Sequence, residues 1–219
     1  MVCALPDCIA IDGPAASGKT TVGSAIARKH GYRFLDTGLM YRAVTLAALR
    51  AGVEPDSRDL ARLIADLDLR VEATPEGTRV FLGEEDVTPR LRDPEVEANV
   101  SKYSAIPEVR EAMVEHQRRI AAAGRVVVAG RDIGTVVLPG APLKLYLDAS
   151  EAARARRRGE QMTQAAAEAR KAIVSRDVVD SSRAVSPLRP ADDAVVIDTT
   201  EMTLEEVIQL ALEKVACAG

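Results

Sequence analysis

A chain of 219 residues that is 47% hydrophobic and 28% charged has the length and composition of one globular domain with a sizeable core. Its net charge of -4 argues against a nucleic-acid-binding protein, which normally carries an excess of basic residues. The three cysteines form no C-x-x-C pair, and neither a basic leader nor a membrane-length apolar run is present, so we expect a cytoplasmic protein with free thiols and no membrane partner.

The first predicted element is an apolar strand at residues 8–12, followed by a glycine-rich segment at 13–20 and a helix that runs to His30. The segment fits the pattern G-x-x-x-x-G-K-[ST], in which backbone N–H groups and the dipole of the following helix bind a phosphate chain. We expect Lys19 to reach the outer phosphates and the Thr20 hydroxyl to bind Mg²⁺. The predicted contacts to the nucleoside triphosphate are Gly13, Pro14, Ala15, Ala16, Ser17, Gly18, Lys19, Thr20 and Thr21.

The alternation of strands and helices continues, with one interruption. A strand is predicted at 32–35, a helix closing at Gly52 follows it, and Asp56 or Ser57 can cap the next helix. Residues 69–73 and 79–83 then alternate apolar and polar around a turn, which predicts a half-exposed antiparallel hairpin. We interpret about 68–92 as a small inserted subdomain. Two helices are predicted after it, near 94–105 and 107–123.

The parallel pattern resumes with predicted strands at 126–129, 143–147 and 194–197. A polar helix is expected from Glu151 to about Asp177, and a last helix begins at the capping box of Thr203 and Glu206. A glycine loop after the first of five strands predicts an α/β fold, a doubly wound five-stranded parallel sheet with helices on both faces and a small inserted antiparallel β subdomain.

In such a sheet, ligands bind beyond the carboxyl ends of the strands. Residues 36–38 follow the second strand and residues 130–132 follow the third, so polar side chains gather where the fold predicts a site. Arg42, Arg131 and the arginines of 154–158 supply more positive charge than one nucleoside triphosphate needs, which indicates a phosphorylated acceptor as well. Taken alone, the arginine run would more often be a solvated helix face.

Four segments together resemble the bacterial cytidylate kinases, and the similarity runs from about Ile9 to Ala216. These segments are residues 13–20, 36–42 (Asp-Thr-Gly-Leu-Met-Tyr-Arg), 130–137 (Gly-Arg-Asp-Ile-Gly-Thr-Val-Val) and 182–188 (Ser-Arg-Ala-Val-Ser-Pro-Leu). The resemblance implies a monomeric nucleoside monophosphate kinase that uses ATP with Mg²⁺ to phosphorylate CMP or dCMP. It also implies one kinase domain over 1–219, with a monophosphate-binding region at 37–125 and a lid at 151–165.

The resemblance implies roles for individual residues. The positions expected around the pyrimidine ring are Thr37, Arg110, Asp132 and Arg183, and those expected at the ribose are Ser101, Arg176 and Asp180. Arg42 and Arg131 are expected to bind the acceptor phosphate. Lys19, Arg131, Arg154 and Arg158 are expected to act in catalysis. The spacing of Arg176, Asp180 and Arg183 independently suggests one helix face, although a surface ion pair would have the same spacing.

One residue departs from the family pattern, and alternative functions remain. Position 129 is alanine where the family often has an acidic residue, so no protein carboxylate is assigned to Mg²⁺. A related kinase that prefers UMP or AMP is the main alternative, and the absence of a Gly-Phe-Pro-Arg segment weighs against AMP. A GTP-dependent switch would need an Asn-Lys-x-Asp element, but Asn99, the only asparagine, precedes Val100.

Overall fold

The computed structural model describes residues 5–162 and 188–218, and its centre is a five-stranded parallel sheet. The strands are β1 (Cys8–Asp12), β2 (Arg33–Asp36), β6 (Val126–Ala129), β7 (Leu143–Asp148) and β8 (Val195–Asp198). They lie in the order β2-β6-β1-β7-β8, and every pair is parallel. This confirms the predicted sheet. The predicted strand ends differ from the observed ones by a single residue at β2, β7 and β8.

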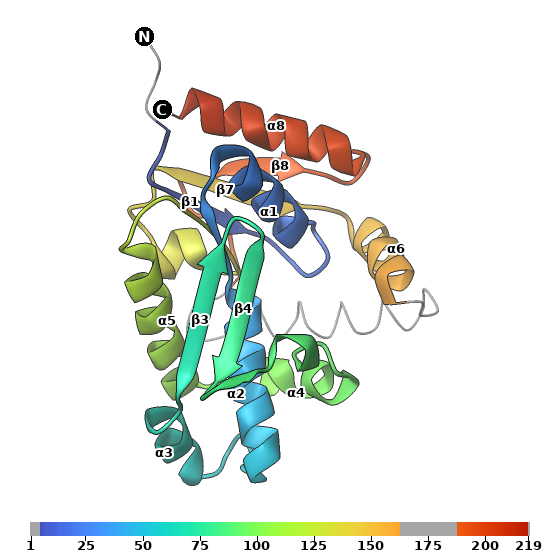
Figure 1. The fold of residues 1–219 in the computed structure, drawn as a ribbon. Coiled ribbons are helices and arrows are strands. Elements are labelled where there is room, and N and C mark those ends of the chain that lie inside the picture. The colour runs from blue at the N-terminus through green and yellow to red at the C-terminus, as the bar shows by residue number, and fades with distance from the viewer. Residues whose placement is uncertain (1–4, 163–187, 219) are drawn as a thin grey trace.

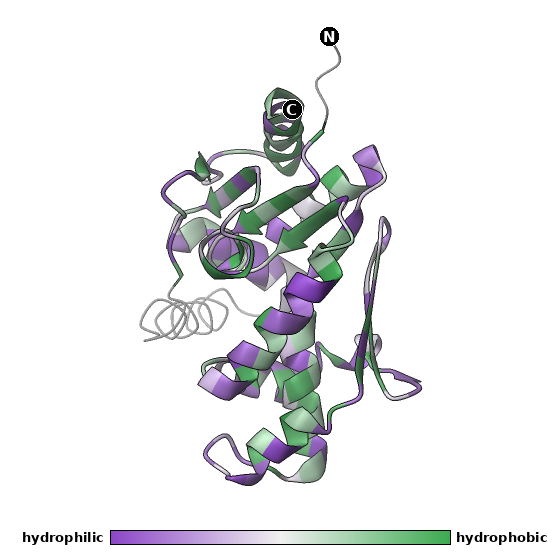
Figure 2. Cartoon of the chain, turned by 90° about the vertical axis from the view of Figure 1, so that its left-hand side faces the viewer, coloured by the Kyte–Doolittle hydropathy of each residue, from purple (hydrophilic) through white to green (hydrophobic). Residues whose placement is uncertain are grey.

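The two faces of the sheet are covered by different helices because successive side chains of a strand point to opposite sides. Ile9 and Ile11 belong to the core layer of α1 (Lys19–His30) and α8 (Leu204–Cys217), whereas Ala10 belongs to that of α2 (Thr37–Ala51) and α5 (Pro107–Ala121). Figure 1 shows α8 above the sheet and α2 below it. The sheet is strongly hydrophobic in Figure 2, and its inner strands β1, β6 and β7 are buried along nearly their whole length, as expected for strands covered on both faces.

The inserted subdomain is an antiparallel sheet of β3 (Leu69–Thr74), β4 (Gly77–Leu82) and β5 (Glu85–Asp86). The predicted hairpin is confirmed, but the two-residue strand β5 was not foreseen because so short a segment has no periodicity. The Thr78 hydroxyl donates to the Phe34 carbonyl at 2.7 Å and accepts from the Asp36 N–H at 2.9 Å. These bonds join β4 to β2, so the inserted sheet lies along the first residues of α2 (Figure 1).

The remaining helices are α3 (Asp59–Ala65), α4 (Pro94–Ser104) and α6 (Glu151–Met162), together with the short 3-10 helix η1 (Thr88–Arg90) and the π-helix η2 (Ile133–Val137). The capping box of Thr203 and Glu206 is confirmed at α8, and Gly52 ends α2 in the left-handed conformation with φ of 63°. Ser57 does accept from the Asp59 N–H at 3.2 Å, although the residue at the N-cap position of α3 is Arg58.

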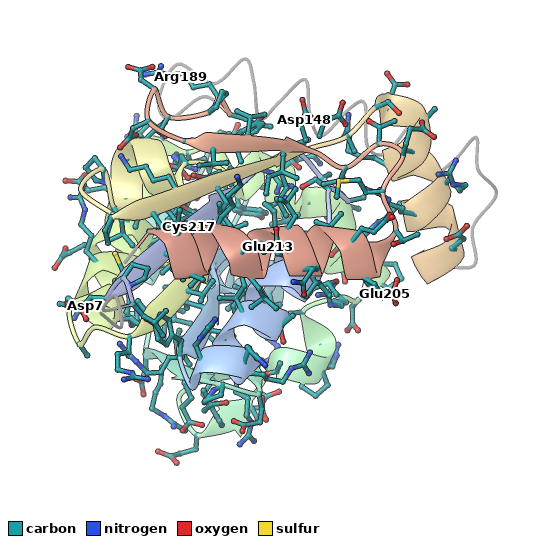
Figure 3. All side chains as sticks on the ribbon, turned by 90° about the horizontal axis from the view of Figure 1, so that it is seen from above. Asp7, Asp148, Arg189, Glu205, Glu213 and Cys217 are labelled. Atoms are coloured by element: carbon teal, nitrogen blue, oxygen red, sulfur yellow. The ribbon has the colours of Figure 1, made fainter. Side chains whose placement is uncertain are left out.

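Seen from above, α8 extends from Glu205 to Cys217 alongside β8 (Figure 3). Asp148 is labelled near β8, where it pairs with Asp198. Asp148 ends β7, and its carbonyl accepts from the Thr199 N–H at 2.8 Å, which ties β7 to the chain after β8. In the described part of the chain no helix is long and apolar enough to cross a membrane. The continuation of the polar helix toward Asp177 lies outside the described residues.

Candidate active site

The phosphate-binding loop at residues 13–20 joins β1 to α1 by a tight turn. Gly13 has φ of 147°, and a Cβ there would lie 2.1 Å from the Leu147 carbonyl oxygen, so β7 leaves no room for a side chain. Gly18 has φ of 96° and is the N-cap of α1. The first N–H groups of α1 therefore open toward the loop, as an anion site at a helix N-terminus requires.

Basic side chains bond to the carbonyl groups of this loop. The Lys19 Nζ donates to the Pro14 carbonyl at 2.6 Å, and the Arg131 Nη1 donates to the Gly13 carbonyl at 3.1 Å. Lys19 is only 8% exposed, yet neither partner carbonyl carries a negative charge. These two bonds bring two cationic side chains to the loop.

Arg154 adds a third cation at the loop. Its Nη1 donates to the Ala15 carbonyl at 3.3 Å, and its Nε donates to the Ala149 carbonyl at 3.0 Å, at the entrance to α6. The structure thus brings Lys19, Arg131 and Arg154 to three consecutive carbonyl groups, although they come from distant parts of the sequence. Such a concentration of charge suits a triphosphate.

A hydroxyl and a carboxylate lie side by side at the edge of the loop. The Thr20 hydroxyl donates to Asp36 Oδ2 at 3.1 Å, and Asp36 Oδ1 accepts from the Gly38 N–H at 3.0 Å as the N-cap of α2. The described residues contain no group of three metal-ligating His, Cys, Asp or Glu side chains. The pair of oxygen donors is nevertheless the chemistry that Mg²⁺ prefers, since that ion is bound through few protein oxygens and several waters.

Asp12 joins the phosphate loop to the segment after β6. Its two carboxylate oxygens accept from the Ile133 and Gly134 N–H groups at 2.8 and 2.7 Å. Burial raises the pKa of Asp12 to about 6, although these two N–H groups and the Lys19 charge favour the ionised form and oppose the increase. Asp12 thereby holds the first residues of η2, directly after Asp132, against the end of β1.

The beginning of α2 touches the same segment. The Thr37 hydroxyl donates to the Ala129 carbonyl at 2.9 Å, and Thr37 is 3% exposed. A Cβ on Gly130 would lie 2.7 Å from the Thr37 oxygen, so glycine is needed for this close approach. Because the hydroxyl proton is already donated, the Thr37 oxygen keeps lone pairs that can accept a further bond.

Arg110 and Asp132, both expected at the base, form a buried ion pair. The Arg110 Nη2 donates to Asp132 Oδ2, and both residues are at most 3% exposed. The Arg110 Nη1 donates to the Ser104 carbonyl at 3.3 Å, and its guanidinium lies 5.5 Å from the centre of the Tyr41 ring. The Arg110 Nε is buried and has no partner among the described residues. A donor of this kind is usually satisfied by an ordered water or by a ligand.

Arg42, predicted to bind the acceptor phosphate, and Arg158, predicted to act in catalysis, form ion pairs with Glu97, a residue that the sequence analysis did not single out. Glu97 on α4 accepts from the Arg42 Nε at 2.7 Å and from the Arg158 Nη2 at 2.9 Å. Arg42 and Arg158 therefore converge although they belong to α2 and α6. Ser101, expected at the ribose, lies one turn beyond Glu97 on α4 and is half-buried. The positions of Arg176, Asp180 and Arg183 lie outside the described residues.

Comparisons with known proteins place this site in a family. The model of the family described as "Cytidylate kinase" matches residues 9–217. The chain belongs to the cytidylate kinase family. Its relatives include the cytidylate kinases of Mycolicibacterium paratuberculosis (50% identical, 91% of each chain covered) and Carboxydothermus hydrogenoformans (44% identical, 94% of this chain and 95% of the relative).

A solved structure supports the fold independently. An uncharacterized protein from Eubacterium ventriosum superimposes with a TM-score of 0.55 at 10% identity, over 95% of this chain and 97% of that one. At such low identity the likeness concerns the fold alone. The enzyme class therefore rests on the family, whose members are nucleoside monophosphate kinases that transfer phosphoryl groups.

Sequence reasoning gave no individual role to three carboxylates at this site. Asp36 was noted only as part of the polar segment after the second strand, and Asp12, the last residue of β1, could have been found by the same rule that ligands bind beyond strand ends. Glu97 lies inside a helix at no recognisable spacing from either arginine, 55 and 61 residues away along the chain. No local pattern could have revealed it.

Proposed function

We propose that the chain transfers the γ-phosphoryl group of ATP to CMP or dCMP, giving ADP and CDP or dCDP. The observation that carries the proposal is the buried pair of Arg110 and Asp132 beside Thr37, at the end of the sheet that holds the phosphate loop. A phosphate loop alone would fit many kinases, whereas this pair gives the site the polar groups with which to select a base.

ATP binds along residues 13–21 in this proposal. Backbone N–H groups at the start of α1 hold the phosphate chain, and Lys19 moves from the Pro14 carbonyl to the outer phosphates. That exchange is favourable because the carbonyl is neutral and the phosphate oxygen is charged. Arg131 and Arg154 can make the same exchange from the Gly13 and Ala15 carbonyls.

The Thr20 hydroxyl and the Asp36 carboxylate fit a magnesium ion carried by the nucleotide. Both offer oxygen, and they are 3.1 Å apart at the loop edge. Asp36 supplies the carboxylate that position 129, an alanine, does not supply. When bound, Mg²⁺ neutralises the outer phosphates and helps to orient the transferred group.

The base and the ribose of the acceptor lie in the monophosphate-binding region that we place at 37–125, and its phosphate faces the phosphate loop. Arg42 and Arg131 bind its phosphate, and Ser101 contacts the ribose; Arg176 and Asp180 are also proposed for the ribose and Arg183 for the base. Arg158, within the lid proposed at 151–165, is held near Arg42 by its bond to Glu97, and we propose that it binds the same phosphate. Residues 163–165 of that lid lie outside the described chain.

Cytosine fits the polar groups at the base better than uracil does. Cytosine offers N3 and O2 as acceptors, which suit the Arg110 guanidinium, and an amino group that can donate to Asp132 or Thr37. Uracil reverses the contacts at N3 and C4. Each buried polar group left unpaired costs about 1–3 kcal/mol, so we propose preference for cytosine over uracil.

Catalysis then consists of positioning and charge. The acceptor phosphate oxygen attacks the γ-phosphorus in line as the bond to the β-phosphate oxygen breaks, and Lys19, Arg131, Arg154 and Arg158 offset the charge that spreads over the phosphoryl oxygens. We propose that the enzyme works as a cytoplasmic monomer without nucleic-acid partners.

A coupled assay of ADP release tests the proposal with a panel of CMP, dCMP, UMP and AMP. We expect kcat/KM for CMP or dCMP to exceed that for UMP and AMP by at least about tenfold, because of the lost base contacts. A higher kcat/KM with UMP or AMP would replace the proposed acceptor by the alternative. ADP release that is independent of every monophosphate would contradict the proposal altogether.

A further inference from the structure

Glu97 is a carboxylate that joins two arginines from different helices, both of which are proposed to bind the acceptor phosphate. One of its oxygens accepts from the Arg42 Nε at 2.7 Å, and the other accepts from the Arg158 Nη2 at 2.9 Å. Arg42 is on α2, Glu97 on α4 and Arg158 on α6 (Figure 1). The two guanidinium groups are held close together because the carboxylate between them offsets their repulsion.

This arrangement differs from the surface ion pairs of the same protein. The side chains of Arg42, Glu97 and Arg158 are 9%, 12% and 21% exposed, whereas those of Arg50 and Glu85 are 38% and 52% exposed. Exposed pairs contribute little because water screens them, but a largely buried carboxylate has lost much of its hydration and depends on its partners. Glu97 also lies in the first turn of α4, where the helix dipole favours negative charge.

The contacts of Arg42 leave its outer end available to a ligand. Its Nε donates to Glu97 and its Nη1 donates to the Gly38 carbonyl at 2.9 Å, so the bonds made among the described residues use two of its five N–H donors. The two donors at Nη2 are not among those used. A phosphate oxygen can therefore bind at Nη2 while Glu97 stays in place at Nε.

We propose that Glu97 is a positioning residue that holds Arg42 and Arg158 in the orientation in which they bind the acceptor phosphate. The inference rests on the proposed function, because it takes both arginines as phosphate ligands. Glu97 fixes two long side chains before the substrate arrives, so less side-chain freedom is lost on binding. Glu97 also links α2 to α6. The position of α6 therefore affects how Arg42 binds the acceptor phosphate, and a bound acceptor in turn favours this position of α6.

The opposite role for Glu97 makes a different prediction. If its carboxylate occupied the place of the acceptor phosphate, then CMP would have to displace it, and a neutral side chain would tighten CMP binding. If it positions the arginines, a neutral side chain loosens them and weakens CMP binding. The sign of the change in CMP affinity therefore separates the two roles.

The test compares Glu97→Gln with the parent enzyme and with Glu85→Gln, which removes the partner of another arginine on the same helix α2. Calorimetry gives the dissociation constants of CMP and of cytidine, which lacks the phosphate, and the coupled assay gives kcat and the KM values for CMP and ATP. We expect Glu97→Gln to weaken CMP binding at least about fivefold and to lower kcat, as expected for loosened charge-assisted bonds to phosphate. Cytidine binding and the KM for ATP should stay within about twofold, as should every constant of Glu85→Gln.

Two results would overturn the inference. Unchanged or tighter CMP binding in Glu97→Gln contradicts a positioning role, and so does an equal loss of CMP and cytidine binding, which a merely structural role would produce. Should Glu97→Gln fail to fold, Glu97→Asp, which keeps the charge and shortens the reach, is judged by the same comparison of CMP with cytidine. A parent enzyme inactive with CMP would instead refute the proposed function, so the two failures are distinguishable.

Discussion

The phosphate loop uses its basic side chains differently from the proposed acceptor region, by which we mean Arg42, Glu97, Arg110 and Asp132. At the loop, Lys19, Arg131 and Arg154 donate to neutral main-chain carbonyl groups. In the acceptor region, Arg110 is paired with Asp132, and Arg42 with Glu97. The loop thus gathers three cationic side chains around the proposed site of phosphoryl transfer, whereas in the acceptor region a carboxylate fixes the direction of each arginine.

This difference explains how one site can bind the triphosphate of ATP for its charge and the nucleoside monophosphate for the identity of its base. A bond to a neutral carbonyl group is readily exchanged for a bond to any phosphate oxygen, so the loop has little need to select among phosphate donors. A guanidinium fixed by a carboxylate keeps its direction but loses much of its net attraction, and direction is what base recognition requires. We therefore expect substitutions at the loop to affect rate most, and those in the acceptor region to affect selectivity.

The largest effect is expected at Lys19. Lys19→Met removes a charge that would offset the charge developing on the transferred group, so kcat should fall by about 10²–10³-fold. The control Lys29→Met removes the same side chain from an exposed position on the same helix and should leave kcat unchanged. Near-normal turnover of Lys19→Met with ATP and CMP, measured by ADP release, would show that the assignment of the phosphate loop is wrong.

A smaller effect, on selectivity, is expected at Arg110. Arg110→Met should lower the ratio of kcat/KM for CMP to that for UMP by at least about tenfold, mainly through loss of CMP activity. Arg119→Met, an exposed arginine of the same helix, is the matched control. Since Arg110→Met leaves the buried Asp132 without its partner, the thermal unfolding of each variant is measured first. An unchanged ratio in a folded variant would remove Arg110 from base selection.

The smallest effect concerns stability and follows from Asp12. Burial raises its pKa to about 6 in the folded protein, so the folded state binds more protons than the unfolded state between the ordinary value of an aspartate and about 6. The free energy of unfolding should therefore fall by about 1 kcal/mol as pH rises from about 4.5 to about 5.5, relative to Asp12→Asn. Urea titrations at a series of pH values measure it.

The control for this experiment is Asp86, whose pKa is lowered to about 2 chiefly by its bonds with Thr88 and Arg79. Asp86 contributes stability above the ordinary pKa of an aspartate, and this contribution is lost as pH falls toward about 2. Asp86→Asn should therefore match the parent between about pH 4.5 and about pH 5.5 in its dependence on pH. An equal slope in Asp12→Asn and the parent would contradict the inferred pKa of Asp12.

The fold could be predicted from the sequence almost completely because it rests on local patterns. Four buried residues in β6 and the period-two alternation of β3 and β4 each define their element within a few residues. The turn from β1 into α1 at the proposed phosphate loop was equally predictable, since it needs only glycines at Gly13 and Gly18 and a helix start. The strand β5 and the π-helix η2 were missed because neither has a periodicity of its own.

The acceptor region was predictable only in part because it depends on pairs of distant side chains. Arg110 and Asp132 were each expected at the base, but nothing in the sequence indicated that they bond to each other across 22 residues. Asp36 was seen as part of a segment after a strand, and its contact with Thr20 became evident only once β2 was placed beside the loop. No sequence pattern indicated a role for Glu97, because its arginine partners are 55 and 61 residues away.

The most direct test of the division between loop and acceptor region is calorimetric binding of each substrate alone to Lys19→Met and Arg42→Met. We expect Lys19→Met to weaken binding of ATP with Mg²⁺ by at least about tenfold, the cost of a lost charge-assisted bond, and to leave CMP binding within about twofold. Arg42→Met should do the reverse, weakening CMP by at least about tenfold and sparing ATP. If both variants weakened both ligands equally, the two regions would not be separate sites, and the account given for them would be wrong.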